Sequence, residues 1–314
     1  MSKIAFVFPG QGSQYVGMGR DLYEQYPEAR TVFDEADEIL GFPLSRLCFE
    51  GPEDILTDTI NAQPAILTMS VACLRALPVL PNLLLGSEPL LSLNPLFCAG
   101  HSMGEYTALV AAGTLDFPSA LRLVRERGRL MKLAGERAPG GMAAVLGLER
   151  EAVEEVCQRA REETEGIVQV ANDNAPGQTV ISGEQAALER AMALAQERGA
   201  RRVVRLAVSI AAHSPLMACI VDEFRAAVGA TSMEEAGIPI VANVTACPIT
   251  AVADIRHELV AQLTSPVRWV ESVQYMIAQG VDTFVEIGPK EVLSGLIKRI
   301  DRNVRRVNVG KAKV

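Results

Sequence analysis

The chain has 314 residues, of which 49% are hydrophobic, and its formal net charge at pH 7 is −8. This length and apolar content are enough to bury a large core, in one large domain or in one domain with a smaller partner. The negative charge argues against nucleic acid as a partner, because basic residues drive binding to phosphate backbones.

The first predicted element is a strand at 4–8, a short apolar run near the N-terminus. The run is too short for a signal peptide, and Pro9 and Gly10 interrupt it at once, so we expect a cytoplasmic protein. The glycine-rich turn at 9–14 would place backbone amides at the carboxyl edge of a sheet, where open α/β folds bind ligands. A phosphate-binding loop is the alternative, but the turn lacks the Lys-Ser/Thr ending and the dinucleotide spacing.

The stretch from Leu77 to Phe97 is rich in leucine and looks like a membrane span at first sight. Four prolines interrupt it, together with Gly86 and Glu88, too often for an uncharged spanning helix of about 20 residues. We interpret it as a long connection, packed on the body of the protein, that leads into the next strand. A patch that binds a partner is the alternative.

The most informative motif is Gly100-His101-Ser102-Met103-Gly104, which lies between an apolar run at 94–99 and a helical stretch at 105–112. This spacing is typical of a nucleophile elbow, a sharp strand-to-helix turn that exposes a serine hydroxyl above the sheet edge. Amides at the start of the following helix would face developing negative charge. An ordinary glycine-serine turn is the alternative, and the flanking strand and helix favour a catalytic serine.

Basic residues form two runs whose role the sequence leaves open. Such runs are most often solvated helix faces, but on an acidic protein they can also bind an acidic partner or phosphates. The first run comprises Arg122, Arg125, Arg127, Arg129 and Lys132, and the second comprises Lys298, Arg299, Arg302, Arg305 and Arg306.

The six cysteines are scattered along the chain without a C-x-x-C pair, and most of them have apolar neighbours. We therefore expect all of them to be buried thiols: Cys48, Cys73, Cys98, Cys157, Cys219 and Cys247.

Residues 139–208 form a separate block in the pattern. Strand-like runs at 142–147, 167–171, 179–181 and 201–208 alternate with helical stretches at 150–163 and 184–198, in the β-α-β-β-α-β order of a ferredoxin-like unit. Pro139-Gly140-Gly141 marks the entry, and the turn formers at 172–178 are expected to connect the two middle strands. Strands and helices alternate again at 239–244 and 283–289. We predict an α/β fold with a mostly parallel sheet from 1–138 and 209–314, and a small subdomain at 139–208.

A nucleophilic serine needs a base, and the chain has three histidines. His101 adjoins Ser102, but neighbours on a sharp turn generally diverge. His257 lies in a charged helical stretch and is expected at the surface. His213 follows the small block in a loop that can reach the main sheet, so elimination and the order of serine before histidine favour it as the general base. Chain order alone does not choose a third, orienting group.

Several motifs occur in the order found in malonyl-CoA:acyl carrier protein transacylases, and the chain resembles this family over essentially its whole length. The resemblance implies an α/β-hydrolase-like main domain with an inserted ferredoxin-like subdomain, in agreement with the pattern above. The motifs that carry it are 6–14, Gln63-Pro64-Ala65, 100–106, Arg127-Gly128, His213-Ser214-Pro215-Leu216-Met217 and Glu286-Ile287-Gly288-Pro289.

The resemblance also assigns roles to the reacting groups. It implies that Ser102 is the nucleophile and His213 its base, with the backbone carbonyl of Gln262 orienting the imidazole. The backbone amides of Gln11 and Met103 would form the oxyanion hole.

Three further residues are implied to bind the substrate. Arg127 would pair with the malonyl carboxylate, which a planar guanidinium can hold through two parallel hydrogen bonds. Gln63 and Asn174 would also contact the substrate. Without the resemblance, Arg127 would be interpreted as a surface residue.

The implied reaction transfers a malonyl group from malonyl-CoA to the phosphopantetheine thiol of acyl carrier protein through a malonyl-serine, without a metal or bound cofactor. We expect a monomer that contacts neither membrane nor nucleic acid. A free-standing domain favours fatty acid synthesis. Ala211 and Ala212 stand where related bacterial enzymes often have proline and serine, so a polyketide-synthase acyltransferase that takes branched malonyl groups is an alternative. Two further alternatives are a serine thioesterase or other hydrolase, and a non-catalytic carrier-binding module.

Overall fold

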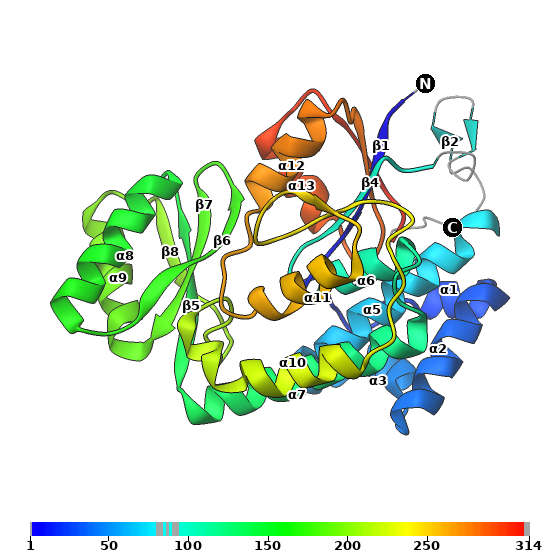
Figure 1. Ribbon diagram of the computed structural model, residues 1–314, viewed down its shortest axis with the longest axis horizontal. Coiled ribbons are helices and arrows are strands. Elements are labelled where there is room, and N and C mark those ends of the chain that lie inside the picture. The colour runs from blue at the N-terminus through cyan, green and yellow to red at the C-terminus, as the bar shows by residue number, and fades with distance from the viewer. Residues whose placement is uncertain (1, 80–83, 86–87, 90–93, 311–314) are drawn as a thin grey trace.

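The computed structural model describes residues 2–79, 84–85, 88–89 and 94–310, and they form two large sheets surrounded by helices, with a separate two-stranded hairpin (Figure 1). The larger sheet has the strand order β10-β9-β4-β1-β11-β12, and all neighbouring strands run parallel except β10 and β9. The predicted α/β class with a mainly parallel sheet is therefore confirmed. Its strands are Ile4–Phe8 (β1), Phe97–Gly100 (β4), Ile240–Val241 (β9), Pro248–Ile249 (β10), Thr283–Glu286 (β11) and Arg305–Asn308 (β12).

The strands of this sheet are apolar because helices cover both faces, as is usual for parallel sheets. In β4 and β11 every residue is buried. The helices of this part are Arg20–Gln25 (α1), Pro27–Leu40 (α2), Leu44–Glu50 (α3), Glu53–Thr57 (α4), Thr59–Ala76 (α5), Gly104–Ala111 (α6), Phe117–Arg137 (α7), Val221–Ala230 (α10), Val252–Ala261 (α11), Trp269–Ala278 (α12) and Val292–Ile300 (α13), with short 3₁₀ turns at Leu77–Val79 (η1) and Pro215–Ile220 (η3).

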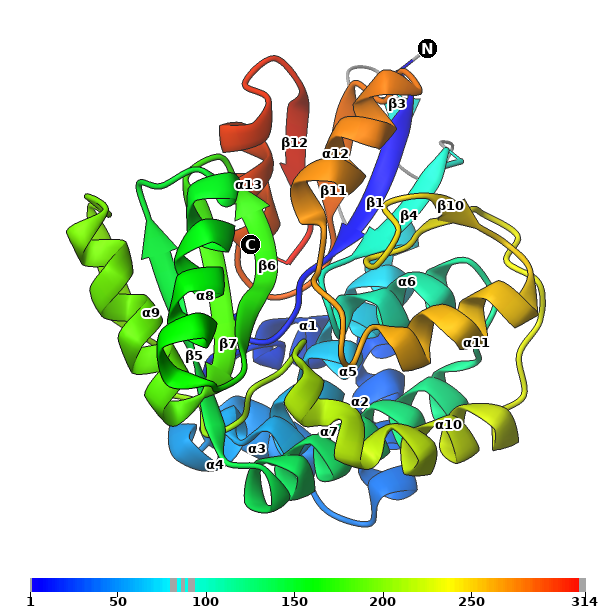
Figure 2. The same cartoon turned by 60° about the vertical axis from the view of Figure 1, so that its left-hand side comes forward.

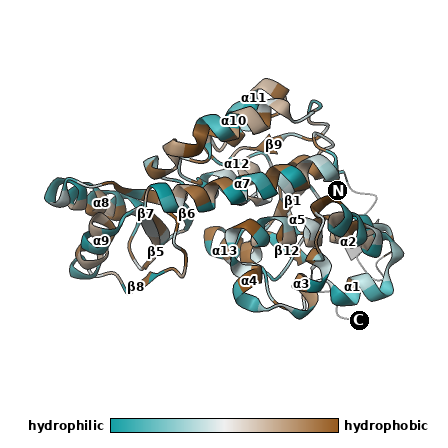
Figure 3. Ribbon diagram, turned by 90° about the horizontal axis from the view of Figure 1, so that it is seen from below, coloured by the Kyte–Doolittle hydropathy of each residue, from teal (hydrophilic) through white to brown (hydrophobic). Residues whose placement is uncertain are grey.

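Helix α5 is the central helix of the large part. Among the described residues, Thr59–Val79 is the one stretch long and apolar enough to cross a membrane, and 78% of its apolar window is buried inside the protein. A helix that is apolar all round and covered on all sides is a core helix. By contrast, the peripheral helix α7 alternates polar and apolar residues and buries one face (Figure 3).

The second sheet is antiparallel, with the order β6-β7-β5-β8, and it stands beside the main sheet (Figure 2). Its elements follow one another as β-α-β-β-α-β, the order that the sequence pattern predicts. They are Gly140–Leu146 (β5), Arg150–Thr164 (α8), Val168–Ala175 (β6), Gln178–Glu184 (β7), Gln185–Glu197 (α9) and Arg202–Arg205 (β8). The two helices pack on one face of the sheet over an apolar core of their own.

The expected connection at 172–178 is wrong, because β6 continues through Ala175 and only Pro176 and Gly177 form the turn. The residues of this part of β6 pair with β7, as in Asn172 with Val180 and Asp173 with Thr179, and a second segment pairs with the other edge of the strand. Asn172 bridges Val267, and the amide of Asp173 donates to the carbonyl of Val267 at 3.0 Å. Strand β6 is thus the edge through which the small sheet joins the large part.

One other expectation, that all six cysteines are buried, needs correction. Four cysteines are buried, but Cys219 and Cys247 are exposed, since each lies where the chain passes over the surface. In the first basic run Arg127 is buried, whereas Arg122, Arg129 and Lys132 are exposed, which is the solvated face expected of a helix such as α7.

Much of the connection expected at 77–97 lies outside the described residues. Its described parts are η1, a two-stranded hairpin of Leu84–Leu85 (β2) and Glu88–Pro89 (β3), and residues 94–97, which lead into and begin β4.

The motif at 286–289 contributes to the fold. Glu286 is fully buried at the end of β11, and its two carboxylate oxygens accept hydrogen bonds from the amides of Leu293 and Ser294, at 2.8 and 2.7 Å. These amides belong to the first turn of α13, whose N–H groups have no partner within the helix. Glu286 therefore fixes the start of α13 against the carboxyl end of the sheet.

Candidate active site

Ser102 lies on the turn between β4 and α6, and its backbone is left-handed, with φ of 51°. The flanking glycines are required by close packing. A Cβ on Gly100 would lie 1.9 Å from the carbonyl carbon of Gly104, and a Cβ on Gly104 would lie 2.2 Å from the carbonyl oxygen of Phe8. The amide of Ser102 donates to Oδ1 of Asn243 at 2.7 Å, which holds the turn. The local geometry is that of a nucleophile elbow.

His213 reaches Ser102 from a distant loop. The Oγ of Ser102 lies 2.8 Å from Nε2 of His213, and Nδ1 of His213 lies 2.8 Å from the backbone carbonyl oxygen of Gln262. A carbonyl only accepts, so Nδ1 carries the proton and Nε2 is free to accept one from the serine. His213 is buried and has a φ of 58°, whereas His257 is exposed as expected.

The surroundings of His213 disfavour its charged form. Burial, and after it the positive charge of Arg127, lower the pKa of His213 to about 3. The backbone carbonyl of Gln262 opposes this shift, but a neutral acceptor stabilises an imidazolium less than a carboxylate would. The imidazole is therefore held in its neutral, basic form.

Arg127 is buried beside the reacting pair, although Arg122 and Arg129 on the same helix are exposed. Its Nη2 donates to Oγ of Ser102 at 3.2 Å and to Oε1 of Gln262 at 2.9 Å, and its Nη1 donates to Oε1 of Gln63 at 2.9 Å. Among the described residues no carboxylate lies within ion-pair distance of this guanidinium, and burial lowers its pKa. A buried cation with neutral partners is costly and can receive an incoming anion.

Close packing of two helices brings Arg127 inward. A Cβ on Gly128 would lie 2.8 Å from the backbone oxygen of Thr59, at the start of α5. Only glycine allows α7 to approach α5 this closely, and the preceding residue then faces the elbow. The glycine at 128 therefore allows the packing that brings the side chain of Arg127 inside the protein.

The two amides expected to form an oxyanion hole both lie along the cleft. Gln11 and Met103 are among its lining residues, and the amides of neither donate to another of the described residues. The turn that carries Gln11 is held from outside by Lys290, whose Nζ donates to the carbonyl oxygens of Gly12 and Gln14 at 3.2 and 2.9 Å. Gly10 lets this turn approach the elbow, because a Cβ there would lie 2.4 Å from the carbonyl oxygen of His101.

The remaining expected substrate contacts occupy different positions. Gln63 is fully buried behind Arg127, and its side chain contacts Met131 as well as the guanidinium, so it lies behind the binding surface. Asn174, on β6, lines the cleft, and its Oδ1 lies 2.7 Å from Nε2 of His101. His101 therefore points away from Ser102, toward the small sheet.

The cleft that contains Ser102, Arg127 and His213 has a volume of about 370 Å³ and lies between the two sheets. One wall carries the polar groups described above. The other is apolar and consists of Met131, Met142, Val180, Leu206, Val208, Ile210 and Ala212. A cleft with one polar and one apolar wall suits a small charged acyl group on a longer chain.

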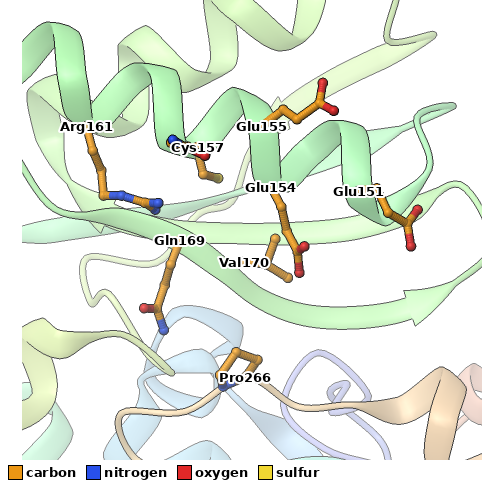
Figure 4. Close-up of a pocket in the computed structure, with 9 residues that line it drawn as sticks. Glu151, Glu154, Glu155, Cys157, Arg161, Gln169, Val170 and Pro266 are labelled. Atoms are coloured by element: carbon orange, nitrogen blue, oxygen red, sulfur yellow. The ribbon is translucent and has the colours of Figure 1, made fainter.

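A second groove of about 510 Å³ lies on the small sheet, between α8 and Pro266 (Figure 4). Glu151, Glu154 and Glu155 line it together with Arg161, and a mainly acidic surface does not suit a ligand that carries phosphates. Gln169 extends from β6 toward the segment of Pro266 in this view, and its Nε2 donates to the carbonyl oxygen of His213 at 2.8 Å.

Sequence reasoning missed Asn243 and Gln169, which hold the backbone of Ser102 and of His213. Asn243 lies near the end of the strand expected at 239–244, just after β9, and this place at the carboxyl edge of the sheet was a usable signal. Gln169 carries no such signal, because its role depends on the docking of β6 beside the loop of His213.

Comparison with known proteins agrees with this geometry. The acyl transferase domain family matches residues 5–311. A malonyl CoA-acyl carrier protein transacylase of Bacillus subtilis is 48% identical over 309 residues, which cover 98% of this chain and 94% of that protein. A crystal structure of an acyl carrier protein S-malonyltransferase from Vibrio cholerae is 43% identical, with a TM-score of 0.90 and coverage of 98% and 96%. A malonyl-transacylase in complex with a type II polyketide synthase acyl carrier protein is 40% identical, with a TM-score of 0.91 and coverage of 98% and 96%.

Proposed function

The chain belongs to the acyl transferase family, among the malonyl-CoA:acyl carrier protein transacylases, and on this premise we propose how its residues perform malonyl transfer. Ser102 is the nucleophile, His213 the general base and Arg127 the group that binds the acyl carboxylate. The Gln262 carbonyl orients His213.

The first half-reaction transfers the malonyl group to the enzyme. His213 Nε2 accepts the hydroxyl proton of Ser102 as Oγ attacks the thioester carbonyl of malonyl-CoA. The amides of Gln11 and Met103 stabilise the oxyanion of the tetrahedral intermediate. The carbon–sulfur bond then breaks, the departing thiolate takes the proton from His213, and coenzyme A leaves a malonyl ester on Ser102.

The second half-reaction reverses these steps with a different thiol. The phosphopantetheine thiol of acyl carrier protein gives its proton to His213 and attacks the ester carbonyl. The serine oxygen leaves and recovers that proton, so the free enzyme is regenerated. The malonyl carboxylate stays on Arg127 in both half-reactions.

The observation that carries this proposal is the buried guanidinium of Arg127 at 3.2 Å from the nucleophile. A thioesterase or other hydrolase needs the elbow and the histidine, but it does not need a buried cation beside them. In a malonyl group one methylene separates the free carboxylate from the thioester carbonyl. The carboxylate can therefore reach the guanidinium while the carbonyl is attacked.

Intact-protein mass spectrometry after mixing with malonyl-CoA tests the function. We expect a covalent malonyl adduct that persists until a phosphopantetheinylated carrier protein discharges it. Rapid release of free malonate would indicate a hydrolase. Absence of an adduct would indicate a carrier-binding module.

The wider assignments follow from the same proposal. We place residues 1–138 and 209–314 in the large subdomain and 139–208 in the small one, because the small sheet begins at Gly140 and ends at Arg205. The partners are malonyl-CoA and acyl carrier protein, which meet the enzyme in turn. We propose a cytoplasmic monomer that supplies fatty acid synthesis. A role in polyketide synthesis is the alternative. The similarity that supports it is to the 40% identical transacylase in complex with a polyketide carrier protein.

Substitution of the general base should slow the first half-reaction. We expect His213→Ala to reduce the rate of malonyl-enzyme formation by about 10²- to 10⁴-fold, the usual contribution of a positioned general base. The measurement is a single-turnover time course of the adduct. His257→Ala, at an exposed position, is the matched control and should leave the rate unchanged. A loss for His101→Ala as large as that for His213→Ala would show that the wrong histidine has been chosen.

The pH dependence should reflect the low pKa of His213. Because the pKa is lowered from 6.5 to about 3, the neutral base is present throughout the range from pH 5 to pH 8. We expect kcat/KM for malonyl-CoA, which reports on groups of the free enzyme, to stay level across this range. A decline that follows a pKa near 6.5 would mean that His213 titrates like an exposed histidine.

A further inference from the structure

Beneath the elbow lies a buried polar network that the reaction scheme does not use. Its centre is Glu105, which is 1% exposed. One carboxylate oxygen of Glu105 accepts from the backbone amide of Asn243 at 3.0 Å and from its Nδ2 at 3.1 Å. The other accepts from Nε2 of Gln262 at 2.5 Å. Glu105 thus contacts the residue that holds Ser102 and the residue that holds His213.

The side chain of Gln262 connects this network to Arg127. Its Nε2 donates to Glu105 and to the backbone oxygen of Ser102, and its Oε1 accepts from Nη2 of Arg127. A guanidinium only donates and a carboxylate only accepts, so these neighbours allow one orientation of the Gln262 carboxamide. Oε1 of Gln262, one of the acceptors of Arg127, is therefore turned toward the guanidinium only while Glu105 accepts from the Nε2 of the same carboxamide.

We propose that Glu105 is a positioning residue for acyl-group recognition: by fixing the carboxamide of Gln262, it aims the guanidinium of Arg127 at the acyl carboxylate. This inference rests on the proposed function, because the carboxylate is that of the malonyl group. Glu105 acts through Gln262 and touches no reacting atom.

The charge of the network is consistent with this role. Burial, and after it the neighbouring Glu258, raise the pKa of Glu105, and burial raises the pKa of Glu258 to about 7. Three N–H groups donate to Glu105, and the backbone amides of Val244 and Asn243 lower the pKa of Glu258. The donors to Glu105 favour a carboxylate there and oppose the rise in its pKa that burial and Glu258 cause.

The variant Glu105→Gln tests the proposal without changing shape. Its oxygen can still accept both bonds from Asn243, but its NH₂ group then meets the NH₂ group of Gln262. The carboxamide of Gln262 must then rotate by half a turn, so that its N–H groups face the N–H groups of Arg127. We expect kcat/KM for malonyl-enzyme formation to fall about ten- to hundredfold, as for loss of a hydrogen bond to a charged group. Labelling of Ser102 by an uncharged sulfonyl fluoride needs the serine and histidine alone, and it should change less than about threefold.

Glu258→Gln is the matched control. It removes a buried glutamate of the same pair, keeps an oxygen for the amide of Val244 and leaves the Gln262 side chain untouched. We expect little effect on either reaction. If wild type and this control form no malonyl adduct while the sulfonyl fluoride labels both, the proposed function itself fails.

Two outcomes for Glu105→Gln would overturn the inference: unchanged malonylation, or equal losses in both reactions. Should this variant not fold, Gln262→Leu decides the matter, since it keeps the backbone carbonyl on His213. We expect it to show the same selective loss of malonylation, and unchanged malonylation would again overturn the inference. Where both variants fold, the double variant should lose no more malonylation activity than either single variant. Both substitutions interrupt the same contacts, from Glu105 through Gln262 to Arg127.

Discussion

Ser102→Ala should abolish both the malonyl adduct and transfer to the carrier protein. The structure places the serine Oγ within hydrogen-bonding distance of His213 Nε2 and Arg127 Nη2, and no other described nucleophile takes part in this constellation. Covalent catalysis then has no acceptor for the acyl group, and we expect transfer to fall by at least about 10⁴-fold, as in other enzymes that lose a nucleophilic serine. Intact-protein mass spectrometry and a carrier acylation assay measure the two losses.

Removal of the serine hydroxyl should leave the fold intact, because the elbow is held by backbone contacts such as that between the Ser102 amide and Asn243. The melting temperature should therefore stay close to that of the wild type. Ser209→Ala, at an exposed serine, is the control and should transfer normally. An adduct of normal yield on Ser102→Ala would mean that another side chain carries the acyl group.

Arg127→Ala should separate malonyl from acetyl groups. The substitution leaves the malonyl carboxylate without its cation in a buried site, where breaking an ion pair costs about 3–5 kcal/mol, or more than a hundredfold in kcat/KM. Acetyl-CoA has no such charge, so its acylation of Ser102 should be unchanged or faster. Measured kcat/KM values for both thioesters give the ratio directly.

Arg127→Lys is the matched variant for the charge. An ammonium keeps the positive charge but cannot reproduce the two parallel hydrogen bonds of the guanidinium, so we expect partial recovery of malonyl transfer. Both variants remove the guanidinium that donates to Gln63 and Gln262, and melting temperatures will show whether the core tolerates this. Equal losses for malonyl- and acetyl-CoA would mean that Arg127 supports the fold and does not recognise the carboxylate.

The sequence by itself determined the parts of this protein that depend on local pattern. Apolar runs gave the strands β1 and β4, and the glycines at 100 and 104 identified the elbow, because close backbone packing there excludes any side chain. The β-α-β-β-α-β order of the small sheet was also visible, since each of its elements has its own periodicity. Elimination among three histidines pointed to His213.

Only the tertiary structure decided the contacts between distant segments. On pattern alone Arg127 is one of several arginines on an amphipathic helix, and it is the approach of α7 to α5 at Gly128 that turns it inward. The pattern at 172–174 predicts a turn, but pairing with β7 on one side and with Val267 on the other keeps these residues in a strand. Glu105, Asn243 and Gln262 lie far apart along the chain and meet beneath Ser102. Such hydrogen bonds leave no periodic trace in the sequence, because each is set by how the surrounding elements pack.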